Sequence, residues 1–244
     1  IIGTGFPVSG TFETDGPVGA IALYRALEVL GARPYIACGA PLSHALAPDY
    51  RVLNLTARNR EAARIEATTQ LSALQPNAIV AIERPGIAAD GSYYNMRGED
   101  ISDHCFYFDP FISQAKCPTI AIGDGGNEIG MGNIARTLTR LDITPSITCC
   151  NELLVADVSN WGAYGLMAFL GLWSQQDLLA KISPEDLLHY LSARGSVDGV
   201  TRQNTLTEDG LLPFEGANII EQLRVLTHFS PRSLERGYSE TMGT

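Results

Sequence analysis

The sequence IIGTGFPVSGTFETDGPVGAIALYRALEVLG at residues 1–31 predicts a strand, a polar loop and a helix in immediate succession. The apolar run at residues 1–6 is short and non-alternating, which is typical of a strand that helices cover on both faces. Asp15 can either cap the following helix or bind a ligand, and Pro17 suits the first helical turn. Apolar residues then recur at helical spacing up to Gly31, where we expect the helix to end.

This alternation of strand and helix continues along the chain. Further apolar runs predict strands at residues 34–38, 52–55, 78–82, 119–122 and 147–150. Helical patterns lie at residues 59–74, 127–141, 160–173 and 217–228, and another helix begins at residue 183. The predicted fold class is therefore α/β, a mostly parallel, doubly wound, Rossmann-like sheet with helices on both faces, in a single domain over residues 1–230. We expect residues 192–215 to form an excursion or lid, and residues 231–244 an irregular tail.

Composition narrows the range of functions. The 244 residues carry a formal net charge of −10, which argues against a nucleic-acid partner because phosphate binding needs a basic surface. The longest uncharged apolar stretch, residues 161–173, is too short to span a bilayer. The five cysteines form no CxxC pair and are predicted to be reduced and mostly buried, so cysteine catalysis is not expected. We therefore expect a cytoplasmic protein with a small-molecule substrate and no membrane partner, and homo-oligomer formation stays open.

Polar residues follow the predicted strands at their carboxyl ends. The candidate site residues are Glu13 and Asp15 after the first strand, Glu83, Arg84, Asp90 and Asn95 after the fourth, Asp124, Gly125, Gly126, Asn127 and Glu128 after the fifth, and Ser159 and Asn160 after the sixth. In a parallel sheet these ends share one edge, where open α/β folds place their ligand crevice. The sequence thus predicts one polar site built from several strands.

The loop GDGGNEIGMG at residues 123–132 is the richest of these segments. Its glycines allow close approach to a ligand, and the helix expected after it would favour an anion. No lysine follows the glycines and Glu128 replaces the third glycine of a dinucleotide motif, so we expect no nucleotide cofactor. Asp124 and Glu128 bring negative charge into this loop, either as partners of the helix dipole or as ligands of a cation. A Mg²⁺ or Mn²⁺ ion held by Glu13, Asp15, Asp124 and Glu128 is the predicted cofactor.

Together these segments resemble the D-glutamate cyclase family. The matching stretches are residues 4–7, 13–20, 81–84, 88–95, 123–132, 158–162, 195–200 and 209–213, so the resemblance covers residues 1 to about 228. It implies an α/β fold, conversion of D-glutamate to 5-oxo-D-proline and water, a divalent cation in some relatives and, for an animal protein, a location in the mitochondrial matrix. Animal members carry a further N-terminal domain, and they tend to have His where this chain has Glu215.

Cyclisation of glutamate requires a base for the amine and neutralisation of the γ-carboxylate. We assign the reacting centre to Asp124, Asn127 and Glu128, with Glu83 as their partner from the neighbouring strand. Arg84 is expected to clamp the α-carboxylate. The remaining predicted substrate-binding residues are Asp90, Asn95, Gly125, Gly126, Ser159 and Asn160. The predicted function is a metal-assisted hydro-lyase; the alternatives are a divalent-metal-dependent phosphatase acting on a small phosphate monoester and a non-catalytic metal- or metabolite-binding protein.

Overall fold

The centre of the molecule is a parallel sheet with the strand order β5-β4-β1-β6-β7-β8, in a computed structural model that describes residues 1–230. The strands are β1 (Ile2–Thr4), β4 (Ile36–Cys38), β5 (Val52–Asn54), β6 (Ile79–Ile82), β7 (Thr119–Gly123) and β8 (Glu152–Val155). In the register, Ile2 of β1 lies opposite Ile36 on one side and Val80 on the other. The strand order reverses between β1 and β6, and doubly wound folds bind ligands at the carboxyl ends of such a strand pair. The predicted fold class is confirmed.

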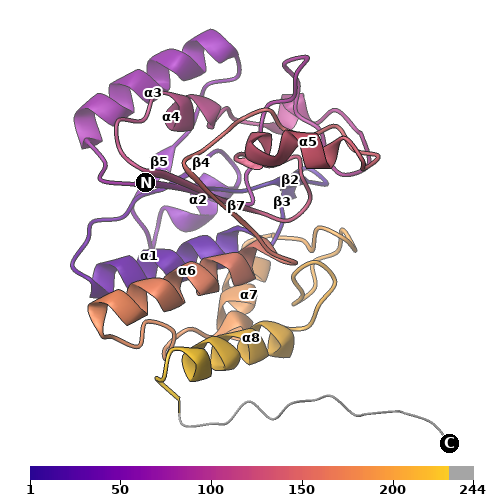
Figure 1. Ribbon diagram of the computed structural model, residues 1–244. Coiled ribbons are helices and arrows are strands. Elements are labelled where there is room, and N and C mark those ends of the chain that lie inside the picture. The colour runs from indigo at the N-terminus through magenta and orange to yellow at the C-terminus, as the bar shows by residue number, and fades with distance from the viewer. Residues whose placement is uncertain (231–244) are drawn as a thin grey trace, which may run out of the picture.

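Helices cover both faces of the sheet (Figure 1). On one face, α1 (Pro17–Val29) and α6 (Ser159–Ser174) lie side by side, with α7 (Pro184–Ser192) and α8 (Pro213–Leu226) packed against them. On the other face lie α3 (Arg60–Leu74) and α4 (Asp109–Ser113). The shorter elements are α2 (Leu42–Leu46), α5 (Ala135–Leu138), the 3₁₀ helices Ser102–His104 and Met131–Ile134, and a hairpin of β2 (Pro7–Val8) and β3 (Thr11–Phe12).

One face of the sheet carries several alanines in its central strands. The strand residues facing α1 and α6 include Ile36, Val80 and Ile122, whereas those facing α3 and α4 include Ala37, Ala81 and Ala121. The stacked rings of Phe108 and Phe111, 5.0 Å apart between centroids, belong to the core on the alanine side. A Cβ atom on Gly3 of β1 would overlap the Phe108 ring. The small residues therefore make room for the aromatic rings on this face of the sheet.

The strand predicted at residues 147–150 is wrong, and β8 begins at Glu152 instead. The backbone of this run pairs with loops. The Ile147 N–H donates to the Ile87 carbonyl at 2.9 Å, and the Thr148 carbonyl accepts the N–H of Gly130 at 2.8 Å. The residue types of an apolar run favour extended backbone, but they do not specify which backbone groups it pairs with.

The helix predicted at residues 127–141 is also wrong. Gly130 has a φ of +96°, in the left-handed region that ends regular helix geometry, and only the short 3₁₀ helix Met131–Ile134 and α5 follow it. The glycine-rich loop thus leads into no long helix, which removes the predicted anion-binding helix start at this point. The last helix, α8, starts at Pro213, four residues before the predicted position at 217.

The structure also tests the predictions for the cysteines and for membrane-spanning helices. All five cysteines are free; Cys38 and Cys105 are buried, Cys117 and Cys150 are half-buried, and Cys149 is exposed. The prediction that the cysteines are mostly buried is therefore wrong. Within residues 1–230, none of the helices has the length and apolar character needed to cross a membrane. The predicted tail at 231–244 lies outside the described residues.

Candidate active site

The N-termini of α1 and α6 meet at the carboxyl edge of the sheet, and each is capped by a side chain from the other segment. Asp15, which precedes α1, accepts the N–H groups of Ser159 at 2.9 Å and Asn160 at 2.8 Å in the first turn of α6. Asn160 of α6 in turn accepts the N–H groups of Gly16 at 2.9 Å and Gly19 at 2.7 Å. Neither helix has a cap from its own N-cap residue. Asp15 therefore caps the start of α6, and its Oδ1 also accepts the N–H of Gly16 at the start of α1, at 2.8 Å.

Three carboxylates converge in front of these helix starts. Asp15, Glu83 and Asp124 each place an oxygen atom within 4.8 Å of the other two. Asp15 lies in the loop before α1, and Glu83 and Asp124 directly follow β6 and β7. All three therefore lie at the carboxyl edge of the sheet, where the sequence predicted a polar site. We call this set the acidic triad.

Glu83 reaches the acidic triad through an unusual backbone conformation. Its φ is +44°, in the left-handed region, which costs a residue with a side chain roughly 1–3 kcal/mol. The Ser159 hydroxyl donates to Glu83 Oε2 at 2.6 Å and fixes the carboxylate in place. Opposite lies Gly16, where a Cβ atom would stand 2.6 Å from the Glu83 Cβ. A side chain at position 16 would therefore collide with Glu83, so this position needs a glycine.

Burial and mutual repulsion raise the pKa of every member of the acidic triad. Burial is the main cause in each case, and negative neighbours add to it. The pKa values of Asp15 and Glu83 lie well above the ordinary carboxyl range, and that of Asp124 rises to about 11. Within residues 1–230, no Lys, Arg or His forms an ion pair with these three groups. The triad therefore favours protons or a bound cation, and its oxygen donors suit a hard ion such as Mg²⁺ or Mn²⁺.

Glu128 lies beside the acidic triad but is bound to its own loop. Its Oε1 accepts the Gly125 N–H at 2.9 Å, and its Oε2 accepts the Gly126 N–H at 2.7 Å. The carboxylate is 1% exposed and holds the glycine loop in shape. Glu13 is likewise buried, and burial raises its pKa. The predicted metal set thus changes: Asp15 and Asp124 belong to the triad with Glu83, whereas Glu13 and Glu128 lie outside it.

Asn127 offers a polar group without a partner. Its side-chain NH₂ donates to the Tyr94 carbonyl at 2.8 Å, which ties the glycine loop to the segment after β6. Its Oδ1 is buried and has no hydrogen-bond partner among the described residues. Asn127 lines the same cavity as Glu83 and Asp124. A buried acceptor at this position can receive a hydrogen bond from a bound ligand.

Residues 192–215 bring two acidic residues to the site that the sequence analysis did not assign. Glu208 is fully buried and accepts the Asn160 side-chain NH₂ at 2.7 Å and the Trp161 indole N–H at 2.9 Å. Asp209 lines the cavity beside Asp124, and the two carboxyl groups interact. Asp209 and Gly210 form a tight turn with φ values of +50° and +77°. The Asp-Gly dipeptide was the available signal, since it favours such turns.

The cavity in front of the acidic triad, which we call the acidic cavity, has a volume of about 520 Å³. That is enough for a small metabolite. Its charged and amide lining consists of Glu13, Glu83, Asn95, Arg97, Glu99, Asp100, Asp124, Asn127, Glu128, Arg202, His104 and Asp209. Arg202 is paired with Glu99 at 3.0 Å. The interior of the acidic cavity is therefore dominated by carboxylates.

Two predicted substrate-binding residues, Arg84 and Asp90, do not line the acidic cavity. Arg84 donates to the Thr4, Gly5 and Phe106 carbonyls and lines a neighbouring cavity, not the acidic cavity, and its role as a clamp of the α-carboxylate stays a prediction. Asp90 is exposed, accepts the Tyr94 hydroxyl at 2.6 Å and does not line the acidic cavity.

The other predicted residues are near the site. Asn95 lines the acidic cavity. Gly125 and Gly126 donate to Glu128, while Ser159 and Asn160 are buried and hold the acidic triad and the helix starts.

Known proteins match most of this chain. The model of the D-glutamate cyclase-like C-terminal family matches residues 1–224. The mitochondrial D-glutamate cyclase of Homo sapiens is 32% identical over 197 residues, which make up 70% of this chain and 32% of the human protein. The matched region thus spans about a third of that relative.

Proposed function

The chain belongs to the D-glutamate cyclase-like family, and on this premise we propose that it converts D-glutamate to 5-oxo-D-proline and water with the help of a divalent cation. The observation that carries this proposal is the acidic triad, three buried carboxylates within 4.8 Å of one another at the edge of a cavity of metabolite size. The triad needs positive charge, and the substrate has an ammonium group.

The reaction joins the α-amine of glutamate to its own γ-carboxyl carbon. The ammonium group loses two protons, one C–N bond forms, and one carboxylate oxygen leaves with two protons as water. The catalyst must therefore both accept and donate protons within one small site.

Glu83 and Asp124 face the acidic cavity and can exchange these protons. In its ionised form, a triad carboxylate accepts a proton from the ammonium group. Because burial raises the pKa of these groups, a triad carboxyl also stays protonated near neutral pH and can donate to the leaving oxygen. The unpartnered Oδ1 of Asn127 can accept a hydrogen bond from the substrate amine and orient it.

Asp15 has a supporting role outside the cavity lining. Its oxygens accept backbone N–H groups at the two helix starts, and it does not line the acidic cavity. It fixes the position of the helices, and in its ionised form it raises the pKa of Asp124.

The donor set fits a divalent cation. Asp15, Glu83 and Asp124 would hold it, and when bound it supplies Lewis-acid polarisation of the γ-carboxylate. The same charge offsets the repulsion between an anionic substrate and the acidic cavity.

The test is an assay of the purified chain for 5-oxoproline release from D-glutamate and L-glutamate, with EDTA, Mg²⁺ or Mn²⁺. We expect turnover of D-glutamate that EDTA abolishes. Release of phosphate from p-nitrophenyl phosphate in place of this activity would support a phosphatase, and metal binding without any turnover would support a binding protein.

A matched pair of variants locates the chemistry. Glu83→Gln keeps an acceptor for the Ser159 hydroxyl and should lower turnover by at least ~10²-fold. Glu61→Gln makes the same change at an exposed position of α3 that does not line the acidic cavity, and it should leave turnover within about twofold. Equal loss in the two variants would contradict the role of Glu83.

A further inference from the structure

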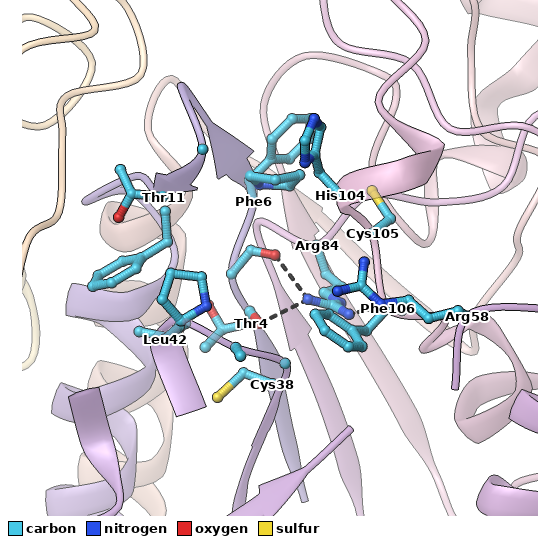
Figure 2. A pocket seen from close by; sticks show the side chains of 17 residues that line it. Thr4, Phe6, Thr11, Cys38, Leu42, Arg58, Arg84, His104, Cys105 and Phe106 are labelled. Atoms are coloured by element: carbon cyan, nitrogen blue, oxygen red, sulfur yellow. Dashed lines mark hydrogen bonds between the residues drawn. The ribbon is translucent and has the colours of Figure 1, made fainter. Parts of the chain in front are cut away.

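A second cavity, of about 190 Å³, adjoins the acidic cavity and has the opposite charge (Figure 2). We call it the basic cavity. Its ionisable lining consists of Arg58, Arg84, His104, Cys38 and Cys105, and no Asp or Glu of residues 1–230 lines it. This composition is unusual in a chain with a net charge of −10. The two cavities share wall residues, among them Phe6 and His104.

Arg84 is the buried cation of the basic cavity. It is 4% exposed, and its guanidinium donates to the backbone carbonyls of Thr4 at 3.1 Å and Gly5 at 2.8 Å, and also to that of Phe106. Figure 2 shows the first two bonds as dashed lines. Its Nε is buried without a hydrogen-bond partner, and no carboxylate of residues 1–230 lies in ion-pair contact with it. The carbonyls orient the guanidinium but leave its charge unneutralised.

Arg58 adds a second positive charge that is already held in place. Its guanidinium lies 3.8 Å from the centroid of the Phe106 ring and donates to the Asp103 carbonyl at 2.8 Å. In Figure 2, Arg58 and Arg84 converge beside Phe106. A guanidinium fixed by stacking loses little further freedom when it binds an anion.

The thiols of the basic cavity do not supply the missing negative charge. Burial raises the pKa of both Cys38 and Cys105 to about 12, so both are neutral near pH 7. Thiolates would otherwise have been the natural counter-ions for the two arginines.

We propose that the basic cavity is a binding site for a small oxyanion, a carboxylate or phosphate group held by the guanidinium groups of Arg58 and Arg84. Guanidinium groups match the oxygen spacing of both kinds of anion. The volume of the basic cavity admits a small anion and excludes a nucleotide. The site is separate from the acidic triad, because Glu83 and Arg84 line different cavities although they are consecutive in sequence.

The experiment is calorimetric titration of the wild-type chain, Arg58→Gln and Arg60→Gln with inorganic phosphate and with acetate, at constant ionic strength and without substrate. Arg60→Gln is the matched control, since Arg60 is exposed, lies two residues away and does not line the basic cavity. We expect saturable binding of at least one anion, weakened about tenfold or more by Arg58→Gln and less than twofold by Arg60→Gln.

The two anions distinguish a phosphate ligand from a carboxylate ligand, and binding of either supports the proposal. Arg84→Lys keeps the charge but removes the planar fork, and it should also weaken binding. Absence of saturable binding by the wild-type chain, or equal weakening in the Arg58 and Arg60 variants, would overturn it. Turnover is not measured, so the result is independent of the proposed reaction.

Discussion

Without a divalent cation, the protein should lose stability as the pH rises from 6 to 8. The pKa values of Asp15, Glu83 and Asp124 are all raised in the fold. A carboxyl group with a raised pKa contributes stability that is complete below its ordinary pKa near 4 and is lost as the pH rises toward its folded value, which is about 11 for Asp124. Over this window the native state binds more protons than the unfolded chain, so the free energy of unfolding falls.

The size of the effect follows from proton linkage. Each proton held only by the native state lowers the free energy of unfolding by about 1.4 kcal/mol per pH unit. One such proton in the acidic triad therefore costs roughly 3 kcal/mol between pH 6 and pH 8, or a fall in Tm of about 6–12 °C for a chain of this size. A cation at a hundred times its Kd should restore about 2.7 kcal/mol at pH 8.

Urea unfolding in EDTA at pH 6, 7 and 8 measures this slope, and Asp124→Asn isolates its source. Asparagine has nearly the same shape as a protonated aspartic acid and cannot ionise. The variant should therefore show a slope shallower by about 1.4 kcal/mol per pH unit and should be the more stable protein at pH 8. Parallel pH profiles for the two proteins would contradict this prediction, because the slope would then come from groups outside the acidic triad.

Two further predictions concern side chains that accept backbone N–H groups, at the helix starts and in the glycine-rich loop. Asn160→Ala removes the acceptor for the N–H groups of Gly16 and Gly19 and a donor to Glu208. At about 1–3 kcal/mol per buried group, the free energy of unfolding should fall by roughly 4 kcal/mol, and the Tm in scanning calorimetry by about 8 °C or more. A fall in Tm of less than about 2 °C would contradict mutual capping of the two helices. Glu128→Gln leaves one oxygen for two N–H groups, so it should lose about 1.5–3 kcal/mol in urea unfolding, and unchanged stability would show that the glycine loop does not depend on this carboxylate.

The sequence predicted the fold class correctly because strands and helices leave local patterns of apolar residues. Short apolar runs and helical periodicity located β1, α1 and α6 and predicted the doubly wound sheet. They failed at residues 147–150 and 127–141, where backbone groups bond to loops distant in sequence. Residue type indicates whether a segment tends to be extended or helical, but it does not identify the partner of each N–H group.

The position of the acidic triad could be predicted from the sequence, but the roles of its individual residues could not. Asp15, Glu83 and Asp124 all follow predicted strands, and a parallel sheet brings such residues to one edge. That Asp15 caps α6 depends on a contact between residues 144 positions apart. Glu208 reaches the site from a segment with no regular structure, so strand positions could not indicate it.

The separation of the two cavities depends on the backbone at the end of β6. Glu83 and Arg84 are consecutive, yet the carboxylate of Glu83 joins the acidic triad, while the guanidinium of Arg84 donates to the carbonyls of Thr4 and Gly5 at the end of β1. An ion pair between these neighbours would neutralise both charges inside the protein. No such ion pair forms, because the two side chains line different cavities. Each cavity keeps a net charge, and that charge gives it affinity for a ligand of the opposite sign.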